Sequence, residues 1–234
     1  MIGTFSAATL ILLALAVCAA IADWAVIAVD GKSRDKVRWL TKGLAPTLLI
    51  LALALHVVER PKPSWAVTVA TFALCLCLLG DYLLLDSKRF IPGMIAFGGA
   101  HLVLILAFFI DQDWDARADD RTLFSGRIIA VAVILVAATL PGRRILRAAV
   151  RNGHGLAVII YMVAITAMTF VAGMHSSAPY GWFAFAGALL FYASDAVLGW
   201  RTFVKRTPPG RGDLAVMIPY HLALGCLGTW ALLV

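Results

Sequence analysis

Residues 64–85 have the sequence SWAVTVATFALCLCLLGDYLLL, an apolar stretch whose one charged residue is Asp81. A helix needs about 20 such residues to cross the hydrocarbon core of a bilayer, which is about 30 Å thick. The whole chain of 234 residues has the same character, with 62% hydrophobic and 14% charged residues. Soluble domains contain roughly 25% charged residues. The stretch therefore predicts a transmembrane helix in a polytopic membrane protein.

Eight apolar stretches of this kind follow one another along the chain. They cover residues 4–29, 37–58, 64–85, 91–111, 123–140, 155–174, 179–200 and 214–234. We therefore predict an all-α fold, in which residues 1–234 form a single domain of eight transmembrane helices. The first stretch lacks the basic region of a signal peptide, so we expect it to be retained. The fifth is the weakest, because Arg127 lies near its start, and residues 143–151 predict a short basic helix on the membrane surface.

Basic residues are distributed unevenly between the two sides of the predicted bundle. The loops after the first, third, fifth and seventh helices contain 14 Lys and Arg residues, and the other loops contain 4. Basic loops tend to stay in the cytoplasm, so this bias places both termini on the non-cytoplasmic side, in a multi-pass protein of the bacterial cytoplasmic (inner) membrane. The same bias explains the net charge of +7 without a nucleic-acid partner.

The four cysteines, Cys18, Cys75, Cys77 and Cys226, all lie within apolar stretches. Packing explains them better than a metal site or a disulfide does. We therefore expect no metal and no cofactor, and the sequence leaves the oligomeric state open.

Several polar residues lie inside the predicted spans, where an ionisable group costs at least ~2.5–3.5 kcal/mol. They are Asp23, Lys42, Asp81, His101, Asp195 and His221, with Tyr161 and Tyr220 nearby. Each has a structural explanation, such as pairing, snorkelling near a helix end, or interfacial anchoring of a tyrosine. At about 1.5 Å per residue, however, most of them fall at one depth in the cytoplasmic half. We therefore predict one polar cavity that opens toward the cytoplasm.

Asp81 and Asp195 are the two carboxyls that we expect in this cavity. Two neighbouring buried carboxyls do not both ionise readily, which gives a neutral acid beside a carboxylate. That combination suits general acid–base catalysis, and it also suits a proton- or cation-coupled transporter. A metal-dependent lipid hydrolase using Asp81, His101, Asp195 and His221 is a further alternative, although no close metal-binding pair supports it.

The surroundings of the two aspartates give a weak indication of an internal repeat. Gly80-Asp81-Tyr82-Leu83-Leu84 and Ser194-Asp195-Ala196-Val197-Leu198 share a small-Asp-x-aliphatic-Leu pattern, and they lie four predicted helices apart. A duplicated four-helix unit would produce this spacing.

The chain resembles the YhhN/TMEM86 family, the lysoplasmalogenases, from the second predicted span to the eighth. The matching elements are Lys42-Gly43-Leu44-Ala45-Pro46, Leu79-Gly80-Asp81-Tyr82-Leu83-Leu84, Phe90-x-x-Gly93-x-x-x-Phe97-x-x-x-His101, Tyr161 with Met168, and Phe191-Tyr192-Ala193-Ser194-Asp195. No single element is specific, but their order and spacing together are. The last span departs from the family pattern Tyr-x-x-Ala-Gln, because Leu224 occupies the Gln position.

The resemblance implies an eight-helix membrane enzyme that hydrolyses the vinyl-ether bond of a lysoplasmalogen. Its partners would be a lysophospholipid substrate and the membrane lipids, and its products a fatty aldehyde and a glycerophospho-alcohol. Asp81 and Asp195 would share the roles of acid, cation stabiliser and base, much as two carboxyls do in glycosidases. The expected substrate-binding residues are Lys42, which would meet the phosphate, and His101, Tyr161, Ser194, Tyr220 and His221.

Overall fold

The computed structural model describes residues 5–29, 34–62, 64–111, 128, 131–132, 136, 141–176, 178–205 and 211–234. Within these residues the regular structure is helical, and no strand is found. The long helices are α1 (Ala7–Ala28), α2 (Arg34–Glu59), α3 (Trp65–Leu83), α4 (Phe90–Ile110), α6 (Gly155–His175), α7 (Gly181–Gly199) and α8 (Leu214–Leu233). Each of the seven is long and apolar enough to cross a membrane. The structure thus confirms a polytopic all-α membrane protein.

The fifth predicted span, residues 123–140, lies outside the described residues except at positions 128, 131–132 and 136, which are helical. The segment after it, residues 141–151, is a helix. Its Arg143, Arg147 and Arg151 are exposed, whereas Ile145 and Ala149 are buried. The predicted short basic helix is therefore present, with its arginines on one side and its apolar residues packed against the bundle.

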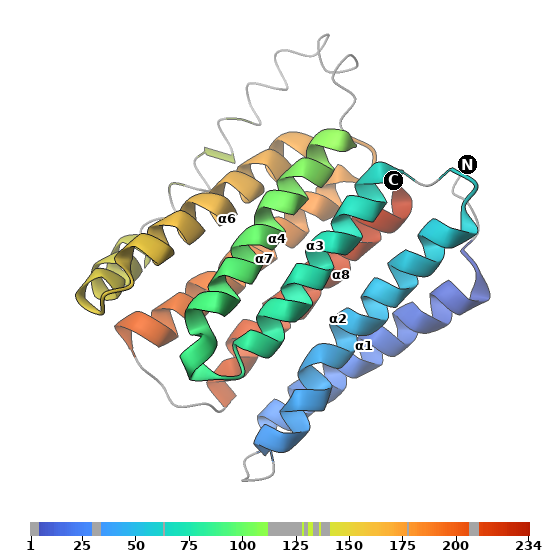
Figure 1. The fold of residues 1–234 in the computed structure, drawn as a ribbon. Helices are drawn as coiled ribbons and strands as arrows, with labels where there is room; N and C mark the ends of the chain where they lie inside the picture. Colours follow the sequence, from blue (N-terminus) through green and yellow to red (C-terminus); the bar gives the residue numbers. More distant parts are fainter. Residues whose placement is uncertain are drawn as a thin grey trace.

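The long helices lie side by side, with α6 at one edge of the bundle and α1 at the opposite edge (Figure 1). Their contacts form a closed ring in the order α2, α3, α4, α6, α7 and α8, and α8 in turn contacts α2. Helix α1 packs on α2 and α8 from outside the ring. The ring therefore supplies an interior that several helices can share.

The bundle has an apolar outer surface, and a few ionisable side chains lie within its mainly apolar interior. Large apolar side chains such as Leu40, Leu106 and Val163 are exposed on the outside of the bundle. Ionisable side chains including Lys42 and Asp81 are buried inside it. A bilayer offers no partners for polar groups, so the expected arrangement places the apolar surface toward lipid and the ionisable groups toward one another.

Helices α3 and α4 approach closely at Gly80. A Cβ atom at this position would lie 2.6 Å from the ring of Phe97. Phe97 is itself buried, so its ring has little room to move. The glycine next to Asp81 therefore allows α4 to pack directly against the turn of α3 that holds the carboxyl.

We predict that Gly80→Ala lowers the melting temperature of the purified protein in detergent. Inserting a methyl group into such a tight contact costs typically about 1–3 kcal/mol. Gly225→Ala in α8 is the matched control, because a Cβ there meets nothing within 4 Å. Its melting temperature should stay the same or rise, and equal losses in both variants would contradict the role of Gly80.

Candidate active site

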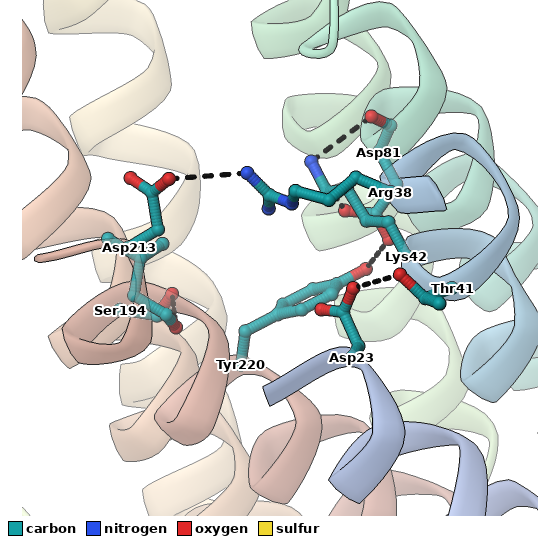
Figure 2. Close-up of polar contacts among 9 residues, drawn as sticks. Asp23, Arg38, Thr41, Lys42, Asp81, Ser194, Asp213 and Tyr220 are labelled. Carbon is teal, nitrogen blue, oxygen red and sulfur yellow. Dashed lines mark hydrogen bonds and ion pairs between the residues drawn. The ribbon is translucent and has the colours of Figure 1, made fainter. Parts of the chain in front are cut away.

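Asp81 forms a buried ion pair with Lys42. The Lys42 Nζ atom lies 3.3 Å from Asp81 Oδ1 and also donates to the Asp81 backbone carbonyl at 3.1 Å. The Tyr220 hydroxyl donates to the other carboxyl oxygen, Oδ2. The exposed fractions of the Lys42 and Asp81 side chains are only 8% and 3%. Figure 2 shows these three side chains converging from α2, α3 and α8.

Asp195 has a different set of partners. The Tyr161 hydroxyl donates to Asp195 Oδ2, and His101 Nε2 lies 3.1 Å from the Tyr161 oxygen. The same His101 nitrogen lies 3.6 Å from Asp195 Oδ2. His101 is fully buried, whereas the Asp195 side chain is 13% exposed. Asp195 is therefore the more accessible of the two carboxyls.

The two aspartates are held by the bundle in a parallel manner. Each lies near the C-terminal end of its helix, Asp81 in α3 and Asp195 in α7. Each is contacted from the preceding long helix, by Lys42 of α2 or Tyr161 of α6. A third helix completes each set, α8 with Tyr220 and α4 with His101. This is the pattern that a duplicated four-helix unit produces, and it supports the repeat suggested by the sequence.

A proline lies close to the site in both α2 and α8. Pro46 is one turn after Lys42, and Pro219 directly precedes Tyr220. A proline inside a helix has no N–H to donate and weakens the backbone ladder locally. The polar side chains thus lie where their helices depart most easily from regular geometry.

A polar cavity of about 130 Å³ joins the two carboxyls. Its polar lining consists of Arg38, Lys42, Asp81, Ser194, Asp195, Asp213 and Tyr220. Five of the eight site residues expected from the sequence therefore line one cavity, and His101 and Tyr161 adjoin it through Asp195.

Arg38 and Asp213 are cavity residues that the sequence analysis did not identify. Arg38 donates to Asp213 at 3.2 Å, and Arg201 pairs with the same carboxyl at 2.8 Å. Arg38 lies one helical turn before Lys42, and residues four apart share a face of a helix. That spacing is the signal in the sequence that indicates a second basic residue on the cavity side of α2.

An apolar pocket of about 70 Å³ adjoins the polar cavity. Met94, Ile145, Val158 and Met162 are among the residues that line it. The two spaces share the side chains of Leu84, Phe97, Asp195 and Leu198. Asp195 is thus the carboxyl at their junction, whereas Asp81 lines only the polar side.

Ser194 and His221 have structural partners of their own. Ser194 donates to the Val216 carbonyl at 2.9 Å, which ties α7 to α8. His221 Nδ1 accepts from the Trp24 indole at 2.9 Å. His221 does not line the polar cavity but a separate, mainly apolar groove that also includes Leu13, Pro46 and Cys226.

Asp23 is fully buried and lies near the polar cavity without lining it. The Thr41 hydroxyl donates to its Oδ1 atom at 2.6 Å, across the α1–α2 contact. Of the two explanations that the sequence offered, pairing and snorkelling, the structure shows a hydrogen-bonded partner. Figure 2 places this pair beside Lys42 and Tyr220.

The described residues contain no group of three or more His, Cys, Asp or Glu side chains that could hold a metal ion. The polar groups of the site instead pair a carboxyl with a lysine or with hydroxyl and imidazole groups. Acid–base chemistry is what this arrangement can perform directly.

Comparisons with known proteins agree with this description. The sequence profile of the YhhN family matches residues 37–228, a range that contains all the cavity residues named above. The protein named Lysoplasmalogenase TMEM86B from Homo sapiens is 28% identical over 189 residues, which cover 81% of this chain and 74% of the relative. Its counterpart from Sus scrofa is 30% identical over 151 residues, which cover 64% and 58%. No solved structure matches the chain.

We predict that Lys42→Met lowers the melting temperature in detergent, because it leaves the Asp81 carboxylate buried without a counter-ion. Breaking a buried pair in this way costs about 3–5 kcal/mol. The double variant Lys42→Met/Asp81→Asn should recover part of the loss. Arg89→Gln, which breaks an exposed pair with Asp86, should have little effect. Equal melting temperatures of the single and double Lys42 variants would contradict this role.

Proposed function

This chain belongs to the YhhN family, and from that membership we propose that it hydrolyses the vinyl-ether bond of lysoplasmalogens. The products are a fatty aldehyde and a glycerophospho-alcohol. Two relatives that bear the name lysoplasmalogenase support this assignment. The structural observation in its favour is the pair of largely buried carboxyls, Asp81 and Asp195, on one polar cavity that adjoins an apolar pocket.

The reaction requires an acid, an anion and a water molecule. Protonation of the vinyl β-carbon converts the ether into an oxocarbenium ion, and water then adds to the carbon bonded to oxygen. The hemiacetal that forms breaks its bond to the glycerol oxygen and releases the aldehyde. Two carboxyls perform the corresponding tasks in glycosidases, which pass through a similar cation. Asp81 and Asp195 are the groups to which we assign this chemistry.

We assign the phosphate of the substrate to Arg38. Lys42, the residue expected from the sequence to meet the phosphate, is already paired with Asp81 inside the cavity. Arg38 lines the same cavity and is held by Asp213. A guanidinium binds a phosphate through two parallel hydrogen bonds, so a phosphate can replace the carboxylate of Asp213 as its partner.

We assign the alkenyl chain of the substrate to the apolar pocket. Its lining is almost entirely aliphatic and aromatic, including Met94, Val158 and Phe203. The linkage between headgroup and chain would then lie where the pocket and the polar cavity share Asp195.

The charge bias of the loops supports a location in the bacterial inner membrane, with the cavity open to the cytoplasm. A lysolipid in the cytoplasmic leaflet would have its headgroup at the interface and its linkage just below. Such a lipid can enter the site without leaving the membrane entirely.

We predict that Asp81→Asn and Asp195→Asn each reduce aldehyde release from a lysoplasmenyl lipid by at least about 100-fold, the lower range for loss of a positioned acid or base. Purified protein should release aldehyde from this lipid and no fatty acid from the matching lyso-acyl lipid. Size-exclusion profiles should show that both variants remain folded. Full activity in both would end the proposal, and ion or proton flux in proteoliposomes without aldehyde release would identify a transporter instead.

We predict that Ala196→Leu shifts the substrate preference toward shorter alkenyl chains, because Ala196 lines the apolar pocket next to Asp195. The measurement is kcat/KM for lysoplasmenyl lipids of graded chain length. Ala193→Leu is the matched control, since Ala193 is an exposed residue of the same helix. An identical chain-length profile for the wild type and both variants would place the chain elsewhere.

A further inference from the structure

We propose that Asp195 is the acid that protonates the vinyl ether and that Asp81, which is paired with Lys42, is the carboxylate that stabilises the cation. This assignment rests on the proposed function. It gives the roles of proton donor and cation stabiliser to two carboxyls that the sequence alone does not distinguish. Three independent features of the structure support it: the charge of the partners, the free position for a proton, and the location relative to the apolar pocket.

The partner of Asp81 requires it to be an anion. The ammonium group of Lys42 is 3.3 Å from its carboxyl and almost completely buried. A buried charge is costly unless it is paired. A proton on Asp81 would leave the lysine charge without a counter-ion, so this carboxyl is poorly suited to alternate between its acid and base forms during turnover.

The partners of Asp195 are a hydroxyl and an imidazole. In the described residues neither a lysine nor an arginine pairs with it, and its contacts are Tyr161 and His101. The Tyr161 hydroxyl gives its hydrogen to Asp195 Oδ2, so its oxygen is free to accept from His101 Nε2. The other ring nitrogen, Nδ1, is buried without a hydrogen-bond partner, so no acceptor is present there for a second ring proton. Protonation of Asp195 therefore leaves no buried lysine or arginine of the described residues without its counter-ion.

The Asp195 carboxyl also has a position for the proton. Tyr161 occupies Oδ2, whereas Oδ1 forms no hydrogen bond within the part of the chain that the structure describes. A proton on Oδ1 can be directed at a substrate without breaking the Tyr161 contact. In this scheme Tyr161 is a positioning residue, because it orients the carboxyl rather than touching the reacting carbons.

Location provides the third argument. Asp195 lines both the apolar pocket and the polar cavity, whereas Asp81 lines the cavity alone. The vinyl ether joins the hydrocarbon chain directly to the glycerol oxygen. If the chain occupies the apolar pocket, the double bond lies next to Asp195, and the cation that forms faces Asp81 across the cavity.

The steps balance in protons and electrons. The Oδ1–H bond of Asp195 breaks as the π electrons of the vinyl ether form a C–H bond at the β-carbon. Water adds to the oxocarbenium carbon and gives one proton back to the Asp195 carboxylate. The hemiacetal then loses its hydroxyl proton while the glycerol oxygen gains one, which cleaves the C–O bond and leaves Asp195 protonated for the next turnover.

Chemical rescue by formic acid tests the assignment in the purified protein. Asp195→Ala removes the acid and leaves a space that formic acid can enter, so added formate buffer should restore aldehyde release by about 10-fold or more. Asp81→Ala removes a fixed anion opposite Lys42, so any rescue of that variant should follow the concentration of the formate anion, whereas rescue of Asp195→Ala should follow neutral formic acid and increase as the pH is lowered. Asp195→Asn is the control, since its amide fills the space. Rescue of Asp81→Ala that follows neutral formic acid, or no rescue of Asp195→Ala by neutral formic acid, would overturn the assignment.

A second pair of variants keeps the test decisive if an alanine variant does not fold. Asp195→Glu retains an acid and should keep measurable activity, whereas Asp195→Asn should fall by about 10²–10⁴-fold, the range expected for a general acid. Equal activities of these two variants would count against Asp195 as the proton donor.

The wild-type enzyme in D₂O separates this inference from the proposed function. Aldehyde that contains one deuterium on the carbon next to its carbonyl shows that the enzyme protonates the vinyl β-carbon, whichever aspartate is responsible. Absence of aldehyde from the wild type would refute the proposed function itself. Labelled aldehyde combined with the wrong rescue pattern would refute only the roles assigned to Asp195 and Asp81.

Discussion

The ion pair between Lys42 and Asp81 is the constraint on which the rest of this structure depends. A lysine and an aspartate whose side chains are almost completely buried have little contact with water, so each needs the other. Their contact, together with the Tyr220 hydroxyl, joins α2, α3 and α8. Gly80 permits α4 to pack against the same turn. The interior of the ring is thus organised around a polar contact, while its lipid-facing surface is apolar.

A second set of contacts around Asp195 repeats this arrangement with one chemical difference. The place of Lys42 in α2 is taken by Tyr161 in α6, and the place of Tyr220 in α8 by His101 in α4. One half of the bundle thus pairs a carboxyl with a lysine, and the other pairs a carboxyl with a tyrosine hydroxyl and an imidazole. An internal repeat that has diverged in this way produces two similar carboxyls in different electrostatic environments, which is the combination that acid–base catalysis needs.

The two adjoining spaces connect this chemistry to an amphiphilic substrate. The polar cavity contains Arg38 and the carboxyls, and the apolar pocket is lined by residues such as Met94 and Val158. Asp195 lies on the wall that they share. In the proposed function, the bond between the glycerol and the chain of a lysolipid would lie at this boundary between polar and apolar surface.

The sequence by itself determined the membrane class and the seven long helices of the described residues. It also showed that Asp81 and Asp195 lie within spans, because apolar length and a charge within a span are local properties. It did not determine partners. Arg38, whose partner is Asp213, was not identified from the sequence. Lys42, expected at the phosphate, has Asp81 as its partner in the structure. His221 follows Tyr220 directly yet faces another groove. Only the tertiary structure decided these points, because helix rotation and packing select which neighbours each side chain meets.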